Sequence, residues 1–160
     1  MPTRIMILNG PNLNLLGERE PEIYGATTLA AIEASAAALA DTLEVETDFR
    51  QTNHEGVMVD WIQEARKSAD AIVINPAGFS FNSIPVLDAL KMFDGPVIEI
   101  HISNIHARDE LHRHSILSTV TRTVICGAGA YGYNLALLAA VNALGLRPNA
   151  LPDPLSTGPV

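Results

Sequence analysis

The chain has 160 residues, of which 48% are hydrophobic and 18% charged, with a formal net charge of −8 at pH 7. That length suits one domain with a sizeable core and is short for two. The acidic balance, with no basic run or stripe, argues against nucleic acid or an anionic membrane as a partner, and the single cysteine, Cys126, excludes a disulfide within the chain.

Hydrophobic periodicity predicts strands and helices in alternation along the chain. The predicted strands cover residues 4–8, 44–51, 71–75, 96–102 and 122–126. The predicted helices cover residues 28–43, 56–69, 83–93 and 131–145. Thr27 or Thr28 is placed to cap the first helix and Gly145 to end the last, and we expect at most brief helix in the segment after residue 105.

Five strand–helix units with apolar strands predict an α/β fold in three layers, with a parallel sheet covered by helices on both faces. Five strands favour the flavodoxin-like order 2-1-3-4-5 over a six-stranded dinucleotide-binding sheet. We expect a single domain over residues 1–146 and a loose, proline-rich tail over residues 147–160. The longest apolar run, 135–146, is shorter than the roughly 20 residues of a membrane span, and the first residues do not form a signal peptide, so we expect a cytoplasmic protein.

Polar residues collect directly after the predicted strands, where sheets of this kind bind their ligands. The first connection, Asn9 to Gly25, has 17 residues, whereas about 2–6 are usual between a strand and its helix. The candidate site residues that follow or end the strands are Asn9, Asn12, Asn14, Arg19, Tyr24, Asn53, His54, Glu55, Asn75, Glu99, His101, Ser103 and His106. Groups able to exchange protons therefore gather at one edge of the sheet, which indicates an enzyme.

Glu99, His101 and Ser103 alternate along the fourth predicted strand and should share one of its faces. Three polar groups on one face of an apolar strand are costly unless they pair. A carboxylate beside an imidazole fixes the tautomer and raises the basicity of the ring, which prepares a histidine for proton transfer. A structural Glu–His pair near a subunit contact is the alternative interpretation.

Arg19 and Tyr24 stand close together in the long first connection. An arginine cation held beside a phenol favours the tyrosinate, which would make the tyrosine a general base on a closing loop. Asn12 and Asn75 are neutral donors that can hold a substrate oxygen or a developing oxyanion. The alternatives are a surface charge, a turn aromatic, and two turn or strand-end residues.

The glycines of "GAGAYG", residues 127–132, match the G-x-G-x-x-G pattern of dinucleotide-binding loops. They belong to the last strand–helix unit, however, and no further strand follows with an acidic residue to bind a ribose. We interpret them instead as allowing the last helix to pack closely on the sheet.

Several motifs together resemble the type II 3-dehydroquinate dehydratases, the flavodoxin-like dehydroquinases of the shikimate and quinate pathways. These motifs are "LNGPNLNLLGEREPEIYG", "QTNHEG", "INPAG", "EIHISNIHAR" and "GYNLALLA", and the similarity extends over roughly residues 4–145. The first motif is long and highly specific. The resemblance implies that the long first connection is the active-site loop of the family, which folds over the substrate.

The reaction implied by the resemblance is an anti-elimination of water from 3-dehydroquinate, through an enolate, to give 3-dehydroshikimate. Tyr24 would remove the C2 proton with Arg19 as its activator, and Asn12 would hold a water against the enolate oxygen. His101, oriented by Glu99, would protonate the departing C1 hydroxyl.

The resemblance also implies how the substrate is held and how the chains assemble. Asn75, Ser103 and the backbone N–H of Ile102 would hold the substrate carboxylate. Asp88 would reach the site of a neighbouring subunit, because the family forms trimers packed into dodecamers. No metal and no organic cofactor is implied.

Phe81 and His112 depart from the family pattern. Phe81 in "AGFSFNSIP" stands where a histidine is usual, and His112 in "DELHRHS" stands where an arginine is usual, while Leu87 replaces a common arginine. In the family, the missing histidine and the arginine replaced by His112 bind the ring hydroxyls remote from the eliminated proton. Two alternatives therefore remain: a lyase acting on a related carboxylated cyclic β-hydroxyketone, and a binding protein without turnover, although a mere binder needs neither a base nor an acid.

Overall fold

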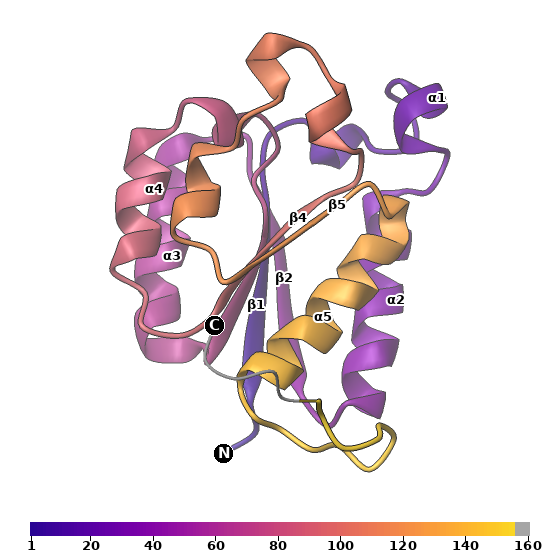
Figure 1. Cartoon of the computed structure of the whole chain (residues 1–160), viewed down its shortest axis with the longest axis vertical. Helices are drawn as coiled ribbons and strands as arrows, with labels where there is room; N and C mark the ends of the chain where they lie inside the picture. The colour runs from indigo at the N-terminus through magenta and orange to yellow at the C-terminus, as the bar shows by residue number, and fades with distance from the viewer. Residues whose placement is uncertain (156–160) are drawn as a thin grey trace.

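The computed structural model describes residues 1–155 and shows a five-stranded parallel sheet with helices on both faces (Figure 1). The strands are β1 (Arg4–Asn9), β2 (Glu46–Gln51), β3 (Ala71–Asn75), β4 (Val97–His101) and β5 (Thr123–Cys126). The helices are α1 (Pro21–Tyr24), α2 (Leu29–Thr42), α3 (Glu55–Ser68), α4 (Ile84–Lys91) and α5 (Gly132–Ala143). The sheet order is β2-β1-β3-β4-β5, which confirms the predicted fold class and strand order.

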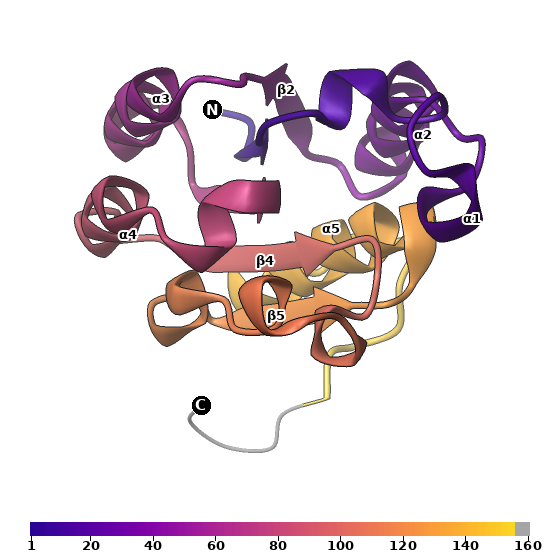
Figure 2. The ribbon, with the colours of Figure 1, turned by 90° about the horizontal axis from the view of Figure 1, so that it is seen from above.

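Each face of the sheet carries its own apolar core, because successive side chains of a strand point to opposite faces. Along β1, Ile5 and Ile7 belong to the core beneath α2 and α5, whereas Met6 and Leu8 belong to the core beneath α3 and α4. Figure 2 shows the same three layers from above, with α3 and α4 on one side of the strands and α2 and α5 on the other. Strands buried on both faces explain the near-continuous apolar runs in the sequence.

The bounds of several elements differ from the predicted ones for local reasons. Thr28 and Ser83 cap α2 and α4 by accepting a backbone N–H on their hydroxyl oxygens, so each helix begins one residue later than predicted. Glu44 has a φ of 61°, which is outside the strand region, so β2 begins only at residue 46. Gly145 follows α5 with a φ of 71°, as expected of a residue that ends a helix.

The long first connection contains two short helices that the sequence analysis did not predict, a 3-10 helix (Leu13–Leu15) and α1. Pro21 opens α1, where a missing N–H costs nothing, and Gly25 with a φ of 74° closes it. Tyr24 therefore ends a helical turn instead of lying in an irregular loop. Helices this short are not stable alone, which is why periodicity did not indicate them.

The chain beyond β4 has the form expected from the sequence. Three 3-10 helices, Ile105–Ala107, Glu110–His112 and Ile116–Thr119, are all the helix present between β4 and β5. Residues 147–155, the described part of the predicted tail, contain no helix or strand, and the rest of that tail, 156–160, lies outside the described residues.

Pro21–Thr42 is the one stretch within residues 1–155 whose length and mean hydropathy of 1.3 would suit a membrane-spanning helix. The fold breaks this stretch between Tyr24 and Leu29, and the second part, α2, packs on the sheet through Ile32, Ala36 and Ala40. The stretch is thus a short helical turn followed by a helix that packs on the sheet through one face.

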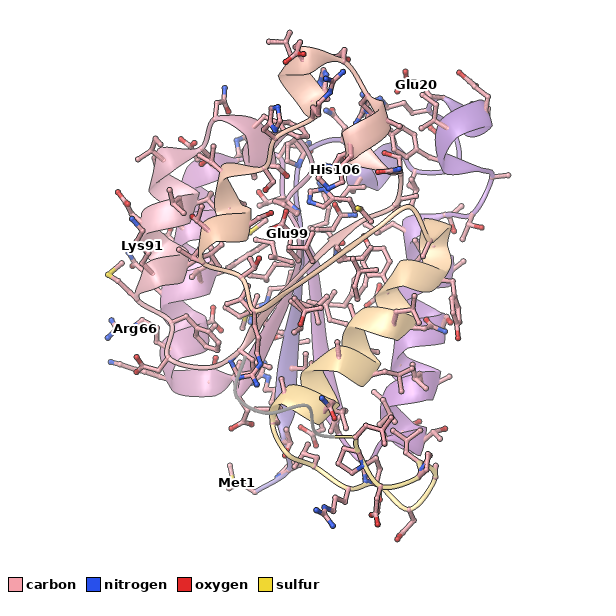
Figure 3. The ribbon with its side chains drawn as sticks, viewed as in Figure 1. Met1, Glu20, Arg66, Lys91, Glu99 and His106 are labelled. Atoms are coloured by element: carbon pink, nitrogen blue, oxygen red, sulfur yellow. The ribbon has the colours of Figure 1, made fainter. Side chains whose placement is uncertain are left out.

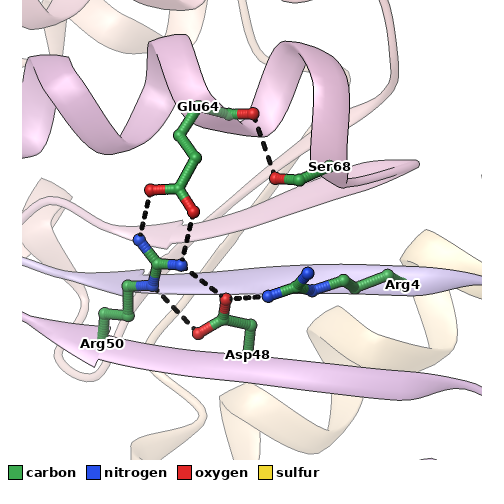
Figure 4. A network of polar contacts seen from close by, with 5 residues as sticks. All are labelled: Arg4, Asp48, Arg50, Glu64 and Ser68. Atoms are coloured by element: carbon green, nitrogen blue, oxygen red, sulfur yellow. Dashed lines mark hydrogen bonds and ion pairs between the residues drawn. The ribbon is translucent and has the colours of Figure 1, made fainter.

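A charged network covers the edge strand β2 and connects it to β1 and α3 (Figure 4). Asp48 accepts hydrogen bonds from Arg4 and from Arg50, and Arg50 also binds the two carboxylate oxygens of Glu64 at 2.8 Å. The hydrogen bonds from Arg50 hold the pKa of the Asp48 carboxyl below its usual range, although burial opposes this. Arg50 also lies over the ring of Trp61, 5.6 Å from its centroid. Charges on an edge strand disfavour pairing with a strand of another chain.

Candidate active site

A cavity opens at the carboxyl ends of β1, β3 and β4, where the sequence analysis placed the candidate residues. Nine of the predicted catalytic and substrate-binding residues line it, namely Asn12, Arg19, Tyr24, Asn75, Phe81, His101, Ile102, Ser103 and His112. The remaining wall consists of Pro11, Leu13, Leu16, Ala77, Gly78, Ile105 and Arg108. Figure 3 shows Glu99 in the interior beneath this end of the molecule and Glu20 at the surface, directly before α1.

Arg19 and Tyr24 lie together at the mouth of the cavity. The guanidinium carbon of Arg19 is 5.8 Å from the centroid of the Tyr24 ring, which is a cation–π contact. Arg19 precedes α1 and Tyr24 ends it, so this single helical turn brings the two side chains to the same side. Arg19 also pairs with Glu20 at 3.3 Å, and both of these side chains are more than 40% exposed, so the pair stands in solvent.

Glu99 and His101 form a buried pair on β4. Their side chains share a face of the strand, as predicted, and His101 Nε2 lies 2.5 Å from Glu99 Oε2. The other oxygen of Glu99 accepts hydrogen bonds from Ser118 at 2.9 Å and from Thr121 at 3.2 Å. Ser103 lies beyond the end of β4 and lines the cavity without joining this pair.

The environment of Glu99 keeps it ionised. Burial by itself raises the pKa of the Glu99 carboxyl, but the hydrogen bonds and the charge of its partners outweigh burial, so this pKa is lowered from its ordinary value. A carboxylate only accepts hydrogen bonds, so His101 donates its Nε2–H to Glu99, which leaves the Nδ1 side of the ring for a ligand. Glu99 thereby orients the ring that lines the cavity.

Asn75 is held in place by a chain of buried hydrogen bonds that the sequence analysis did not foresee. Its Nδ2 donates to the hydroxyl of Tyr133 at 2.8 Å, and that hydroxyl donates to Oδ1 of Asn9 at 2.7 Å. Asn9 in turn donates to the carbonyl of Arg50 at 3.0 Å. Burial raises the pKa of Tyr133, so its hydroxyl stays neutral and can both donate and accept. The only available signal was the position of Tyr133 in the "GYNLALLA" motif.

Phe81 and His112 share one stretch of the cavity wall. Their ring centroids are 5.3 Å apart, with the ring planes at 77°. His112 Nδ1 lies 2.9 Å from both carboxylate oxygens of Asp109, and hydrogen bonding to His112 holds the pKa of the Asp109 carboxyl below its usual range. The ring of His112 is therefore fixed by one ionised carboxylate and one aromatic edge.

Arg108 is a lining residue to which the sequence analysis assigned no role, although it stands in the "EIHISNIHAR" motif. With Arg108, the wall contains two arginines, Arg19 being the other, and two histidines, but no Asp or Glu side chain. A cavity with cationic and no anionic groups, in a protein of net charge −8, favours an anionic ligand.

Other candidate residues lie outside this cavity. Asp88 on α4 has a side chain that is 63% exposed and pairs with Lys91 at 3.8 Å. Besides Asp88 and the buried Glu99, the candidates that do not line the cavity are Asn9, Asn14, Asn53, His54, Glu55 and His106. A Cβ on Gly132 would lie 3.0 Å from the side chain of Ile100, so the close packing predicted for the "GAGAYG" glycines is confirmed at Gly132.

Within residues 1–155, no group of three or more His, Cys, Asp and Glu side chains is arranged to hold a metal ion. The chemistry that the cavity offers comes from a phenol, two imidazoles, two guanidinium groups and neutral amides. Such a set suits the transfer of protons to and from an anionic substrate.

Comparison with known proteins identifies the family. The family sequence model described as "Dehydroquinase class II" matches residues 3–141. The chain belongs to the class II dehydroquinase family.

Individual relatives are similar to the chain over most of their own length. The chain is 57% identical to a 3-dehydroquinate dehydratase of Streptomyces avermitilis over 134 residues, which are 83% of this chain and 84% of the relative. It is 51% identical to a 3-dehydroquinate dehydratase of Rhizobium meliloti over 142 residues, 89% of this chain and 96% of the relative. A catabolic 3-dehydroquinase of Verticillium alfalfae is 53% identical over 137 residues, 86% of this chain and 91% of the relative.

A solved structure of a class II dehydroquinase agrees with the fold. The crystal structure of the type II dehydroquinase of Propionibacterium acnes has a TM-score of 0.85 and 42% identity to the chain, covering 89% of this chain and 98% of the other. The family membership inferred from the motifs is thus confirmed.

Proposed function

We propose that the chain is a type II 3-dehydroquinate dehydratase, which removes water from 3-dehydroquinate to give 3-dehydroshikimate. The observation that carries the proposal is a single cavity lined by the Arg19–Tyr24 pair from the loop and by His101 from β4. Elimination needs a base for a carbon-bound proton and an acid for the departing hydroxyl. The two sides of the cavity provide one of each.

The reaction proceeds in two proton transfers. Tyr24, as tyrosinate beside the Arg19 cation, removes the proton from C2, and the electrons of that C–H bond form an enolate. Asn12 holds a water against the enolate oxygen and so stabilises its charge. The enolate then collapses and the C1–O bond breaks, while His101 in its imidazolium form gives its Nδ1 proton to the departing hydroxyl, which leaves as water.

The substrate is held by its carboxylate. Asn75, Ser103 and the backbone N–H of Ile102 surround one part of the cavity and supply neutral donors. Asn75 uses one hydrogen of its amide nitrogen for Tyr133, which leaves the second for the ligand. Arg108 and His112 add positive or polar character to the wall, which favours an anion.

The direct experiment follows the enone absorbance of the product after 3-dehydroquinate is added to the purified protein. We expect turnover without added metal or organic cofactor. Binding without turnover would mean a binding protein, and neither turnover nor binding would favour another substrate.

A second candidate is supported by the Phe81–His112 contact. An aromatic edge cannot donate a hydrogen bond to a ring hydroxyl, so this part of the wall suits a related carboxylated cyclic β-hydroxyketone with fewer hydroxyls. Steady-state kinetics with 3-dehydroquinate and with a deoxy analogue separate the two candidates, since the better substrate has the higher specificity constant.

We also propose a homo-oligomer, a dodecamer built from trimers, in which Asp88 reaches the site of a neighbouring subunit. Support comes from α4, where the exposed Asp88 is flanked by Ile84 and Met92, which are 55% and 45% exposed. Apolar side chains beside an outward-facing carboxylate suit a contact between chains. Light scattering should show the oligomer, and a stable, active monomer would contradict it.

The wider setting is proposed on the same basis. The dehydration serves either the shikimate pathway or quinate breakdown, and one of the relatives reported above is named a catabolic enzyme whereas another is not. We assign the catalytic domain to residues 1–146 and a cytoplasmic location to the protein. Fractionation of the producing cells would test the location, and removal of residues 147–160 with full retention of activity would support the domain boundary.

A further inference from the structure

The carboxyl end of β2 contains a motif that the proposed chemistry does not use. Gln51, Asn53 and His54 of "QTNHEG" do not line the cavity. Asn53 nevertheless contacts the active-site loop, because its Oδ1 accepts a hydrogen bond from the backbone N–H of Asn12 at 2.9 Å. The same oxygen accepts a second hydrogen bond from Gln51 Nε2 at 3.0 Å.

Asn12 has an uncommon backbone conformation that such support stabilises. Its φ is 69° and its ψ is −4°, in the left-handed region, which asparagine adopts more readily than most residues with a side chain but which is still uncommon. Asn12 also precedes a 3-10 helix, yet its side chain makes no capping hydrogen bond. The amide is thus left to face the cavity, which it lines.

The segment around Asn12 is held from two sides. On one side, a Cβ on Gly10 would lie 2.3 Å from the carbonyl oxygen of Pro76, so the loop touches the β3 connection directly. On the other side, Gln51 Nε2 donates to the carbonyl of Gly10 at 3.2 Å. Gln51 therefore contacts both the loop and the side chain of Asn53.

Asn53 is itself anchored by its neighbour Thr52. The N–H of Thr52 donates to the carbonyl of Asn9 at 3.0 Å, and its hydroxyl accepts from the N–H of His54 at 3.0 Å. Thr52 is buried. The acceptor that Asn53 offers to Asn12 is consequently attached to the end of β2 and is not free to follow the loop.

We propose that Gln51 and Asn53 are positioning residues that hold Asn12 in its left-handed conformation, with its amide directed at the enolate oxygen. The inference rests on the proposed function for the role of Asn12. Without Asn53, the backbone of Asn12 relaxes and its amide turns away from the site of charge development. Because Asn12 acts on the enolate and other residues hold the carboxylate, kcat falls and KM stays nearly constant.

The test compares Asn53→Ala with Asn53→Asp. The alanine removes the acceptor, whereas aspartate keeps an oxygen that both donors can reach. We expect Asn53→Ala to lower kcat by roughly 10–100-fold, less than the roughly 100–1000-fold of removing an oxyanion donor outright. Asn53→Asp should recover most of this loss. His54→Ala is the matched control, since His54 is exposed and its side chain makes no cap to α3, and its kcat should be unchanged.

A double-mutant cycle separates positioning from general damage. If Asn53 acts only through Asn12, adding Asn53→Ala to Asn12→Ala should cost almost nothing further. If the two substitutions instead lower kcat by independent factors that multiply in the double variant, the proposal is overturned. A normal kcat in Asn53→Ala would also overturn it. If Asn53→Ala does not fold, Gln51→Ala is measured instead. A normal kcat in that variant would equally contradict the positioning role of Gln51 and Asn53.

Hydrogen exchange supplies a readout that does not require activity. Exchange at the backbone amide of Asn12 should accelerate in Asn53→Ala and return toward normal in Asn53→Asp. An unchanged exchange rate would overturn the positioning role. If the natural protein proved inactive on 3-dehydroquinate but showed this exchange pattern, the proposed function would be wrong. The proposal that Gln51 and Asn53 hold the backbone of Asn12 would still be supported.

Discussion

The rings of Phe81 and His112 meet edge to face on the cavity wall, with their centroids 5.3 Å apart. The contact joins the two residues that the sequence analysis interpreted as departures from the family pattern, so we expect their effects on the substrate to be coupled. Phe81 cannot donate to a hydroxyl, and His112 has already committed Nδ1 to Asp109. This part of the wall therefore retains one ring nitrogen, Nε2 of His112, for a substrate hydroxyl.

The first prediction concerns this wall. Loss of one or two hydrogen bonds should place the kcat/KM for 3-dehydroquinate roughly 10–1000-fold below that of a family member with histidine and arginine there. The double variant Phe81→His with His112→Arg should recover part of the deficit, and steady-state kinetics would measure it. His114→Arg adds the same charge to an exposed neighbour outside the cavity and should change nothing.

An analogue lacking a remote ring hydroxyl should be tolerated better by the natural protein than by the double variant, because a site built to bind a hydroxyl is left unpaired without it. The natural protein could already have the kcat/KM of a typical family member, with no increase in the double variant. In that case other residues bind the ring hydroxyls and this argument fails.

The second prediction concerns the base. Tyr24→Phe removes the phenol hydroxyl and keeps the ring beside Arg19. We therefore expect kcat to fall at least about 100-fold, with little change in the affinity for product. Arg19→Ala should act in the same direction. Tyr131→Phe is the matched control, since Tyr131 is 59% exposed and lies outside the cavity. A Tyr24→Phe enzyme with near-normal kcat would remove Tyr24 from the mechanism.

The third prediction concerns Glu99. Glu99→Gln keeps the shape of the side chain but removes the charge that orients and stabilises a protonated His101. A charge-assisted hydrogen bond contributes about 1.5–3 kcal/mol, so kcat should fall roughly 10–100-fold while KM changes little. Thr121→Val removes only one hydroxyl from the same carboxylate and should have a much smaller effect. Equal effects of the two variants would argue that Glu99 serves stability alone.

The fourth prediction concerns Tyr133 and pH. Tyr133→Phe leaves Asn75 and Asn9 without a buried partner, so the free energy of unfolding at pH 8 should fall by about 1–3 kcal/mol, and KM should rise because Asn75 is less well held. Because the pKa of Tyr133 is raised in the folded protein, only the unfolded state ionises as the pH passes the ordinary tyrosine value of about 10.

The stability that the neutral phenol provides is thus present below pH of about 10 and is lost as the pH rises toward the folded pKa. The difference in unfolding free energy between the natural protein and Tyr133→Phe should therefore narrow in alkali. Urea unfolding at two pH values, one below and one above the ordinary tyrosine pKa, measures it. A difference that stays constant or widens would be inconsistent with a buried neutral Tyr133.

Several features of the protein could be predicted from its sequence because they depend on local patterns. Apolar runs and 3.6-residue periodicity determined the five strands and the four long helices, and parallel strand–helix units then left few possible sheet orders. Since the carboxyl ends of parallel strands meet at one edge, Asn12, Asn75 and His101 could be placed at a common site without knowing any distance.

The tertiary structure alone decided which side chains support that site. Asn75 and Tyr133 are 58 positions apart in the chain, Asn9 and Tyr133 are 124 apart, and Asn12 and Asn53 are 41 apart, so no local pattern connects them. The α1 turn that brings Arg19 to Tyr24 is likewise too short to be stable on its own. Such contacts depend on how separate elements pack around one cavity, and the periodicity of a single segment does not predict that packing.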